Sequence, residues 1–256
     1  MNKVQILLLA LLAFQGRVPG EEVDLYLLGG QSNMNGSGRT ANLPKAVSSH
    51  APNALYQFGA AWLPLDLTKT RTSHQMGQFG PELGFAHEMK SSGRTLYLSK
   101  YAASGMGLHH GWHGGKWAGG NPAPRRRNFY PGEKADDPNQ GTLYQGMVRK
   151  FQIGIEALKK KGHTPAIRVF VWMQGEQDSK NEVSAKEYGE SLMRLQRRLS
   201  EDLATKRTIP LVFGQVLPHL PADERFTHSE VIRAQMKKVG QATNLKMIST
   251  DGFGLL

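Results

Sequence analysis

Ser32 lies in the segment Gly30-Gln-Ser-Asn-Met34, which directly follows an apolar run at residues 23–29. The run predicts a buried strand, and a serine just beyond such a strand lies where α/β sheets gather their ligands. A neighbouring glycine lets the backbone turn sharply enough to expose the hydroxyl. Ser32 is therefore a candidate nucleophile. Its alternative role is to cap the following helix through its side-chain oxygen.

A second polar segment, Trp172-Met-Gln-Gly-Glu-Gln-Asp178, also follows a predicted strand. Its Glu176 and Asp178 suggest the paired carboxylates of a glycosidase, which lie roughly 5 to 9 Å apart across the scissile bond. Carboxylates two residues apart beside a glycine are better suited to orient Gln174 and the turn. Asn33 and Gln31 are expected to brace the nucleophile turn in a similar way.

Together, Gly-Gln-Ser-Asn-Met and Trp-x-Gln-Gly-Glu-x-Asp resemble the sialate O-acetylesterase and carbohydrate esterase family 6 branch of the SGNH hydrolases. Between them, Gly80-Pro-Glu-Leu-Gly-Phe-Ala86 is similar to that family's Gly-Pro-Glu helix start. Lys100-Tyr-Ala-Ala-Ser-Gly-Met-Gly-Leu108 is similar to its Gly-Gly-Thr-Ser loop. The resemblance covers about residues 23–251.

The resemblance implies a serine esterase that removes O-acetyl groups from sialic acid or other carbohydrates through an acyl-Ser32 intermediate. The implied oxyanion donors are the backbone N–H groups of Ser32 and Gly105 and the side-chain amide of Gln174, with Gly107 as an alternative to Gly105. The residues expected to support them are Gln31, Asn33, Gly175, Glu176 and Asp178. An acetylated carbohydrate is the implied partner, and neither a metal nor an organic cofactor is implied. Two alternatives are a catalytically impaired or inactive carbohydrate-binding relative and a lipase-like hydrolase of simple acyl chains.

In the family, the catalytic histidine belongs to a late Asp-x-x-His motif, which this sequence lacks. Asp251 does not supply the motif because Gly254 stands three residues later. We expect a domain without its C-terminal Asp-x-x-His segment, a substitute histidine, or a sugar-binding protein without turnover, and the sequence leaves all three open. The candidate substitutes are His109, His110, His113, His219 and His228.

His109, His110 and His113 also suggest a metal site, but their spacing fits none of the well-known zinc patterns. A place at the rim of a pocket, or simple exposure, is the favoured interpretation. The three residues belong to a glycine- and proline-rich segment, residues 104–142, that we expect to lie over the strand ends and shape the substrate cleft. Its Trp112, Trp117 and Tyr130 either stack on sugar rings or anchor the segment.

The 256 residues, 39% of them hydrophobic, are enough for one sizeable core, and no linker is evident. Residues 1–20 have the positive head and apolar stretch of a secretory signal, too short for stable membrane insertion, so we expect a secreted or periplasmic domain at 21–256. Without residues 1–20 the chain has 30 basic and 21 acidic residues, a formal net charge of +9, which favours acidic sugars or anionic polysaccharide surfaces. The dense basic cluster Arg125-Arg126-Arg127 matches no nucleic-acid motif, so we expect no nucleic acid, and no protein partner is evident.

Apolar, β-rich runs alternate with helical patterns along the chain, which predicts parallel strands joined by helices. The strands are expected at 23–29, 95–100, 167–173, 209–215 and 245–249. The helices are expected at 80–92, 143–161, 184–204 and 228–241. The predicted fold is a three-layer α/β/α sandwich around a central parallel sheet, flavodoxin-like as in SGNH hydrolases.

Overall fold

A seven-stranded sheet in the order β11-β10-β9-β1-β6-β3-β4 forms the centre of the computed structural model, which describes residues 20–218 and 224–252. Its strands are β1 (Glu22–Gly30), β3 (His50–Phe58), β4 (Ala61–Asp66), β6 (Leu96–Ala102), β9 (Thr164–Met173), β10 (Leu211–Gly214) and β11 (Leu245–Ile248). All neighbouring strands pair in parallel except β3 and β4, which are antiparallel. The predicted parallel sheet is confirmed apart from this edge.

The β3–β4 hairpin at the edge was not predicted. Pro52 and Pro64 interrupt the apolar pattern of its two strands, and a proline inside a strand argues against a central position. An edge strand tolerates Pro64 because one side of its backbone needs no partner. The hairpin therefore makes the sheet mixed without changing the order of its parallel strands.

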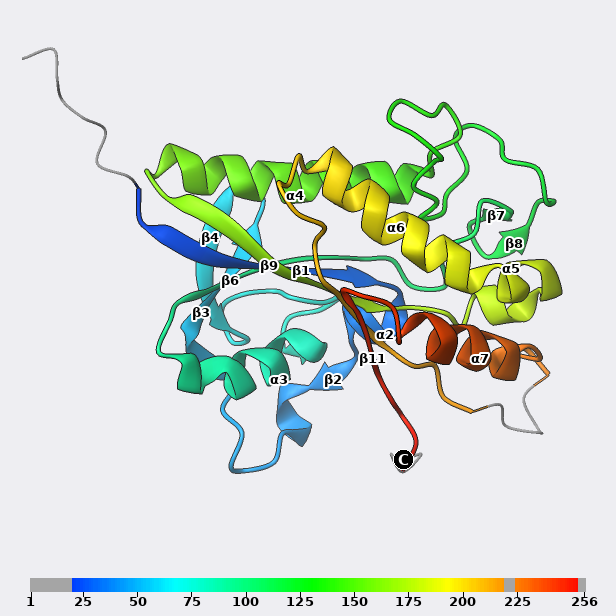
Figure 1. Cartoon of the computed structure of the whole chain (residues 1–256). Coiled ribbons are helices and arrows are strands. Elements are labelled where there is room, and N and C mark those ends of the chain that lie inside the picture. The colour runs from blue at the N-terminus through cyan, green and yellow to red at the C-terminus, as the bar shows by residue number, and fades with distance from the viewer. Residues whose placement is uncertain (1–19, 219–223, 253–256) are drawn as a thin grey trace, which may run out of the picture.

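Helices cover both faces of the sheet, with α4 and α6 on one side and α3 on the other (Figure 1). The α-helices are α2 (Ser32–Asn35), α3 (Pro81–Glu88), α4 (Thr142–Lys160), α5 (Glu182–Lys186), α6 (Tyr188–Asp202) and α7 (Ser229–Val239). The 3-10 turns are η1 (Thr40–Asn42), η2 (Met89–Ser92) and η3 (Asp178–Lys180). The three-layer α/β/α fold is confirmed, although the helix expected at 184–204 is divided between α5 and α6.

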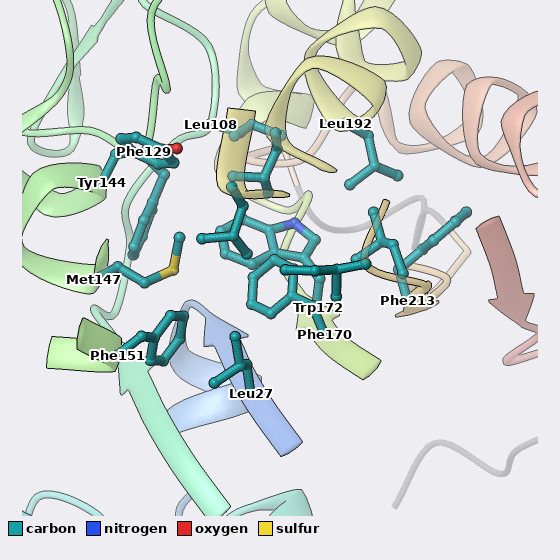
Figure 2. Packing of buried hydrophobic residues seen from close by; sticks show 14 of the residues in the cluster. Leu27, Leu108, Phe129, Tyr144, Met147, Phe151, Phe170, Trp172, Leu192 and Phe213 are labelled. Carbon is teal, nitrogen blue, oxygen red and sulfur yellow. The ribbon is translucent and has the colours of Figure 1, made fainter. Parts of the chain in front are cut away.

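The two faces of β1 enter two separate hydrophobic clusters. Leu25 and Leu27 pack into the larger cluster with α4 and α6, whereas Tyr26 and Leu28 pack into the smaller one with α2 and α3. This alternation follows the two-residue period of a strand that is buried on both faces. Figure 2 shows the larger cluster, in which Phe170 and Trp172 of β9 lie close to Leu27. The sheet is thus packed against a hydrophobic cluster on each face, and this packing keeps the carboxyl ends of its strands in fixed positions.

The segment at 104–142 is anchored in the core. Its only described strands are β7 (Trp112–His113) and β8 (Lys116–Trp117), but Leu108 and Phe129 are buried in the larger cluster (Figure 2). Trp112 and Tyr130 are also buried, at 3% and 1% exposure. For Trp112 and Tyr130, burial favours anchoring of the segment over stacking on sugar rings, whereas Trp117 is half-buried and both of its predicted roles stay open.

The predicted signal segment lies outside the described residues except for Gly20 and stays a prediction, as does the expected location outside the cytoplasm. His219 lies in the undescribed interval 219–223. Among the described helices, none has the length and apolar composition needed to cross a membrane.

Candidate active site

The backbone turn between β1 and α2 presents Ser32 at the carboxyl end of the sheet. Gly30 has φ +148°, and a Cβ atom there would lie 2.1 Å from the carbonyl oxygen of Met173, so a side chain does not fit. The Gln31 N–H donates to that same carbonyl at 2.9 Å. Ser32 is exposed and is the first residue inside α2, whose N-cap position is Gln31 with no side-chain cap. Ser32 therefore does not cap the helix, and its hydroxyl is free for chemistry.

Glu176 braces the turn that presents Ser32, from the end of β9. Its carboxylate accepts hydrogen bonds from the side-chain amides of Gln31, at 2.8 Å, and Asn33. These two residues flank Ser32 in sequence. Burial raises the pKa of Glu176, the Asn33 amide opposes that shift, and the charge of Asp178 adds to it. Gln31, Asn33 and Glu176 thus form one hydrogen-bonded unit around the serine.

Asp178 is fully buried and joins the turn after β9 to the segment at 104–142. One carboxylate oxygen accepts from Leu108 N–H at 2.8 Å and from the Gln174 amide at 2.5 Å. The other accepts from His109 N–H at 3.0 Å and from the Trp112 indole at 3.1 Å. Burial raises the pKa of Asp178 to about 6, against the opposing effect of these four donors.

Gln174 is buried, and several neighbours contact its amide. The amide nitrogen donates to Asp178 and, at 3.2 Å, to the carbonyl oxygen of Met106. The Tyr188 hydroxyl lies 3.1 Å from the Gln174 amide oxygen and donates to its carbonyl oxygen at 2.5 Å. In this arrangement both amide hydrogens already have acceptors. The predicted role as an oxyanion donor therefore requires one of these hydrogen bonds to open when substrate binds.

The turn after β6 contains Gly105, the second predicted oxyanion donor. Gly105 has φ +68°, and a Cβ atom would meet nothing within 4 Å. Its N–H has no hydrogen-bond partner among the described residues. Gly107 differs, because a Cβ there would lie 2.2 Å from the Trp112 ring. The backbone is held close to the nucleophile turn by the hydrogen bond from Ala103 N–H to the Gly30 carbonyl, at 3.0 Å. Gly175 follows Gln174 with φ +153° and packs against Val216.

The favoured interpretation of the three clustered histidines, a pocket rim or simple exposure, is wrong for His109, which is 1% exposed, whereas His110 is half-buried and His113 is exposed. His109 Nε2 lies 2.8 Å from a Glu187 carboxylate oxygen, and its Nδ1 accepts from Gly111 N–H at 2.8 Å. Burial lowers the pKa of His109 to about 4, so the ring is neutral near pH 7. His110 hydrogen-bonds the carbonyl of Gly120, and His113 Nδ1 accepts from Arg127 N–H at 3.2 Å. Residues 20–218 and 224–252 contain no cluster of three or more side chains suited to a metal ion.

Sequence reasoning missed His74, whose Nε2 lies 3.2 Å from the Ser104 hydroxyl beside Gly105. His228 occupies the N-cap position of α7, where its backbone N–H donates to the Ser179 carbonyl at 2.9 Å. No histidine in the described part of the chain hydrogen-bonds the Ser32 hydroxyl. Asp251 pairs with Arg233 instead of with a histidine.

A buried ion pair beside the turn that presents Ser32 was also missed. Lys100 Nζ lies 2.7 Å from a Glu82 carboxylate oxygen and donates to the Asn35 carbonyl at 3.0 Å. Glu82 in turn accepts from Gly80 N–H at 3.0 Å. Both side chains are almost completely buried. The pair connects the Gly-Pro-Glu segment to the last residue of α2 and so supports the turn that presents Ser32.

A family model described as carbohydrate esterase, sialic acid-specific acetylesterase, matches residues 22–256. The chain belongs to this family. The recognised resemblance and the carbohydrate esterase function are thereby confirmed. No curated protein matches the esterase in sequence.

Solved structures share the fold of the esterase. A protein of Arabidopsis thaliana has a TM-score of 0.65 at 18% identity, over 93% of this chain and 89% of that one. A carbohydrate acetylesterase from Xanthomonas citri has a TM-score of 0.57 at 17% identity, over 88% of this chain and 49% of that one. NanS has a TM-score of 0.57 at 16% identity, over 93% of this chain and 80% of that one.

Proposed function

We propose that this carbohydrate esterase removes O-acetyl groups from sialic acid or a related sugar through an acyl-Ser32 intermediate. The observation that carries the proposal is the braced turn, in which Ser32 is exposed while Glu176 binds the amides of both flanking residues. A nucleophile held on a rigid turn at the end of a strand meets the geometric demand of acyl transfer.

In the proposed reaction the Ser32 oxygen attacks the acetyl carbonyl carbon, and the resulting oxyanion is stabilised by nearby N–H donors. The unpartnered N–H of Gly105 is the donor that the geometry favours most, together with that of Ser32 itself. As the tetrahedral intermediate collapses, the bond to the sugar oxygen breaks, the proton that leaves the Ser32 hydroxyl passes to that oxygen, and the sugar leaves with a free hydroxyl while Ser32 keeps the acetyl group. A water molecule then attacks the acetyl group, releasing acetate and regenerating the serine.

A second candidate function is sugar binding without turnover. It is favoured by one observation, that no described histidine hydrogen-bonds the Ser32 hydroxyl, since an activated serine ordinarily has an adjacent base. The two functions share a substrate class and differ only in whether the ester is cleaved.

Acetate release distinguishes them. The purified protein is incubated with O-acetylated sialic acid, acetylated xylan and 4-nitrophenyl acetate, beside a Ser32→Ala variant. We expect release of acetate from an acetylated sugar that Ser32→Ala abolishes. Binding of the acetylated sugar with equal, background hydrolysis by both proteins would instead assign the second function. Preference for longer acyl esters would indicate a lipase-like hydrolase.

A further inference from the structure

A cavity of about 260 Å³ opens beside the nucleophile turn, where α2, the end of β6 and α4 meet. Its walls come from segments far apart in sequence, and the side chains that define its character are Asn35, Tyr56, Arg71, Ser73, Lys100 and Lys150. A pocket assembled from several rigid elements, with a few convergent polar groups, has the form of a small-molecule site.

The charges around this cavity are unbalanced. Arg71, Lys100 and Lys150 line it, whereas no aspartate or glutamate is among its described lining residues. Glu82 neutralises Lys100 from below, at 2.7 Å. Within residues 20–218 and 224–252, neither the Arg71 nor the Lys150 side chain has a carboxylate partner or a hydrogen-bond acceptor. Two positive charges therefore face the cavity without a counter-charge from the protein.

Lys150 is costly to keep in this position. It is half-buried on α4, its ammonium lies 5.9 Å from the centre of the Tyr56 ring, and burial together with Lys100 lowers its pKa to about 8. A buried cation without a partner destabilises the folded state. Such groups gather at binding and catalytic sites, where a ligand supplies the missing charge.

The cavity lies within reach of the reacting serine. Asn35 lines it and is the last residue of the single-turn helix that begins with Ser32. Ala102 also lines it and pairs with Gly30, two residues before Ser32. Ser73 connects the cavity wall to the turn, since its hydroxyl accepts from Asn35 at 3.1 Å and donates to Gly36 O at 2.5 Å. A ligand held in the cavity therefore lies beside the turn that presents Ser32.

We propose that Arg71 and Lys150 form an anion subsite that binds the carboxylate of an acidic sugar while its acetyl ester lies at Ser32. The inference rests on the proposed function, because it names the group that the substrate presents beside the ester. Arginine matches a carboxylate with two parallel N–H donors, and lysine adds a point charge. The subsite selects acidic over neutral acetylated sugars.

Binding to a Ser32→Ala host tests the subsite apart from turnover. Calorimetry measures the dissociation constants of sialic acid and of its carboxyl methyl ester for the host and for hosts that carry Lys150→Met or Arg71→Gln. Each substitution should weaken sialic acid binding about 10-fold or more, the usual effect of losing a charged hydrogen bond, and should leave methyl ester binding unchanged. Lys160→Met removes the same charge from an exposed position of the same helix and should change neither constant.

The outcomes separate the subsite from the esterase function. Loss of sialic acid binding in both variants supports the subsite even if the wild-type protein releases no acetate, in which case only the proposed function fails. Undiminished cleavage of acetylated sialic acid by Lys150→Met and Arg71→Gln, with unchanged binding, would overturn the subsite alone. If Lys150→Met and Arg71→Gln weaken the binding of inorganic phosphate but not of sialic acid, the cavity binds a free anion and not the sugar carboxylate. This result would also overturn the proposed subsite. Because the Lys150 side chain has no carboxylate partner in the described part of the chain, Lys150→Met should not lower the melting temperature.

Discussion

Replacement of Asp178 by asparagine should destabilise the protein at pH 7 and disorder the segment at 104–142, which contains Gly105. The carboxylate accepts four hydrogen bonds, two on each oxygen, from Leu108, His109, Trp112 and Gln174. An asparagine offers one oxygen and one NH2 group of nearly the same shape. Whichever way the amide lies, two buried donors then face another donor. Each unsatisfied buried group costs about 1–3 kcal/mol, so we expect a loss of about 2–6 kcal/mol in unfolding free energy.

The assay is equilibrium unfolding in urea at pH 7, supported by melting temperatures, which should fall by at least about 4 °C in a chain of this size. Asp136→Asn is the matched control, because Asp136 is exposed in the same segment and has φ +58°, which asparagine also tolerates. A change below about 1 kcal/mol in Asp178→Asn would refute the hydrogen-bonding scheme around this carboxylate.

The same pair of proteins gives a pH test. Because burial raises the pKa of Asp178 from 3.8 to about 6, the folded state binds the proton more tightly than the unfolded state. The stability of the wild type relative to Asp178→Asn should therefore rise as the pH falls from 7 towards 4, by up to about 3 kcal/mol. A difference that stays constant with pH would contradict the raised pKa.

Three further substitutions test the groups around the nucleophile. Gln174→Ala should lower kcat about 100-fold or more with little change in KM, if the amide becomes an oxyanion donor; a raised KM alone would make it a binding residue. Glu176→Gln should lower kcat. In the wild type, activity should fall as the pH drops through the raised pKa of Glu176, because protonation removes an acceptor for the Gln31 and Asn33 amides. The Glu176→Gln variant should not show this loss with pH. Lys100→Met should cost about 3–5 kcal/mol in urea unfolding, since it leaves Glu82 buried without its partner; an unchanged midpoint would show that the ion pair does not support the fold.

The sequence contained enough to predict the parallel strands and the place of Ser32. Strands buried on both faces produce continuous apolar runs, and the change from such a run to Gly-Gln-Ser marks the end of β1 directly. The β3–β4 hairpin could not be recognised in this way. Pro64 argues against a strand unless that strand lies at the edge of the sheet, and the sequence does not show which strand forms the edge. Local sequence patterns thus predicted the central strands of the sheet but not the hairpin at its edge.

The contacts of charged and amide side chains were less predictable. Lys100 and Glu82 are 18 residues apart, and charged residues in a strand and a helix ordinarily indicate exposed faces. Their burial follows from pairing in three dimensions, which no periodicity reveals. Gln174 was correctly placed at the end of β9, but its amide contacts depend on Asp178 and on the Met106 carbonyl of a distant loop. Glu176 accepts from Gln31 and Asn33, and Asp178 accepts from Gln174, which is compatible with the predicted supporting role of the two carboxylates; that role stays a prediction.

The central claim is that Ser32 is the nucleophile, and covalent labelling with a fluorophosphonate followed by peptide mass spectrometry tests it most directly. We expect a single adduct on Ser32, no adduct in Ser32→Ala, and normal labelling in Ser37→Ala, whose exposed serine lies just beyond the same turn. An adduct on Ser104, the serine that hydrogen-bonds His74, or labelling that persists in Ser32→Ala, would contradict the account.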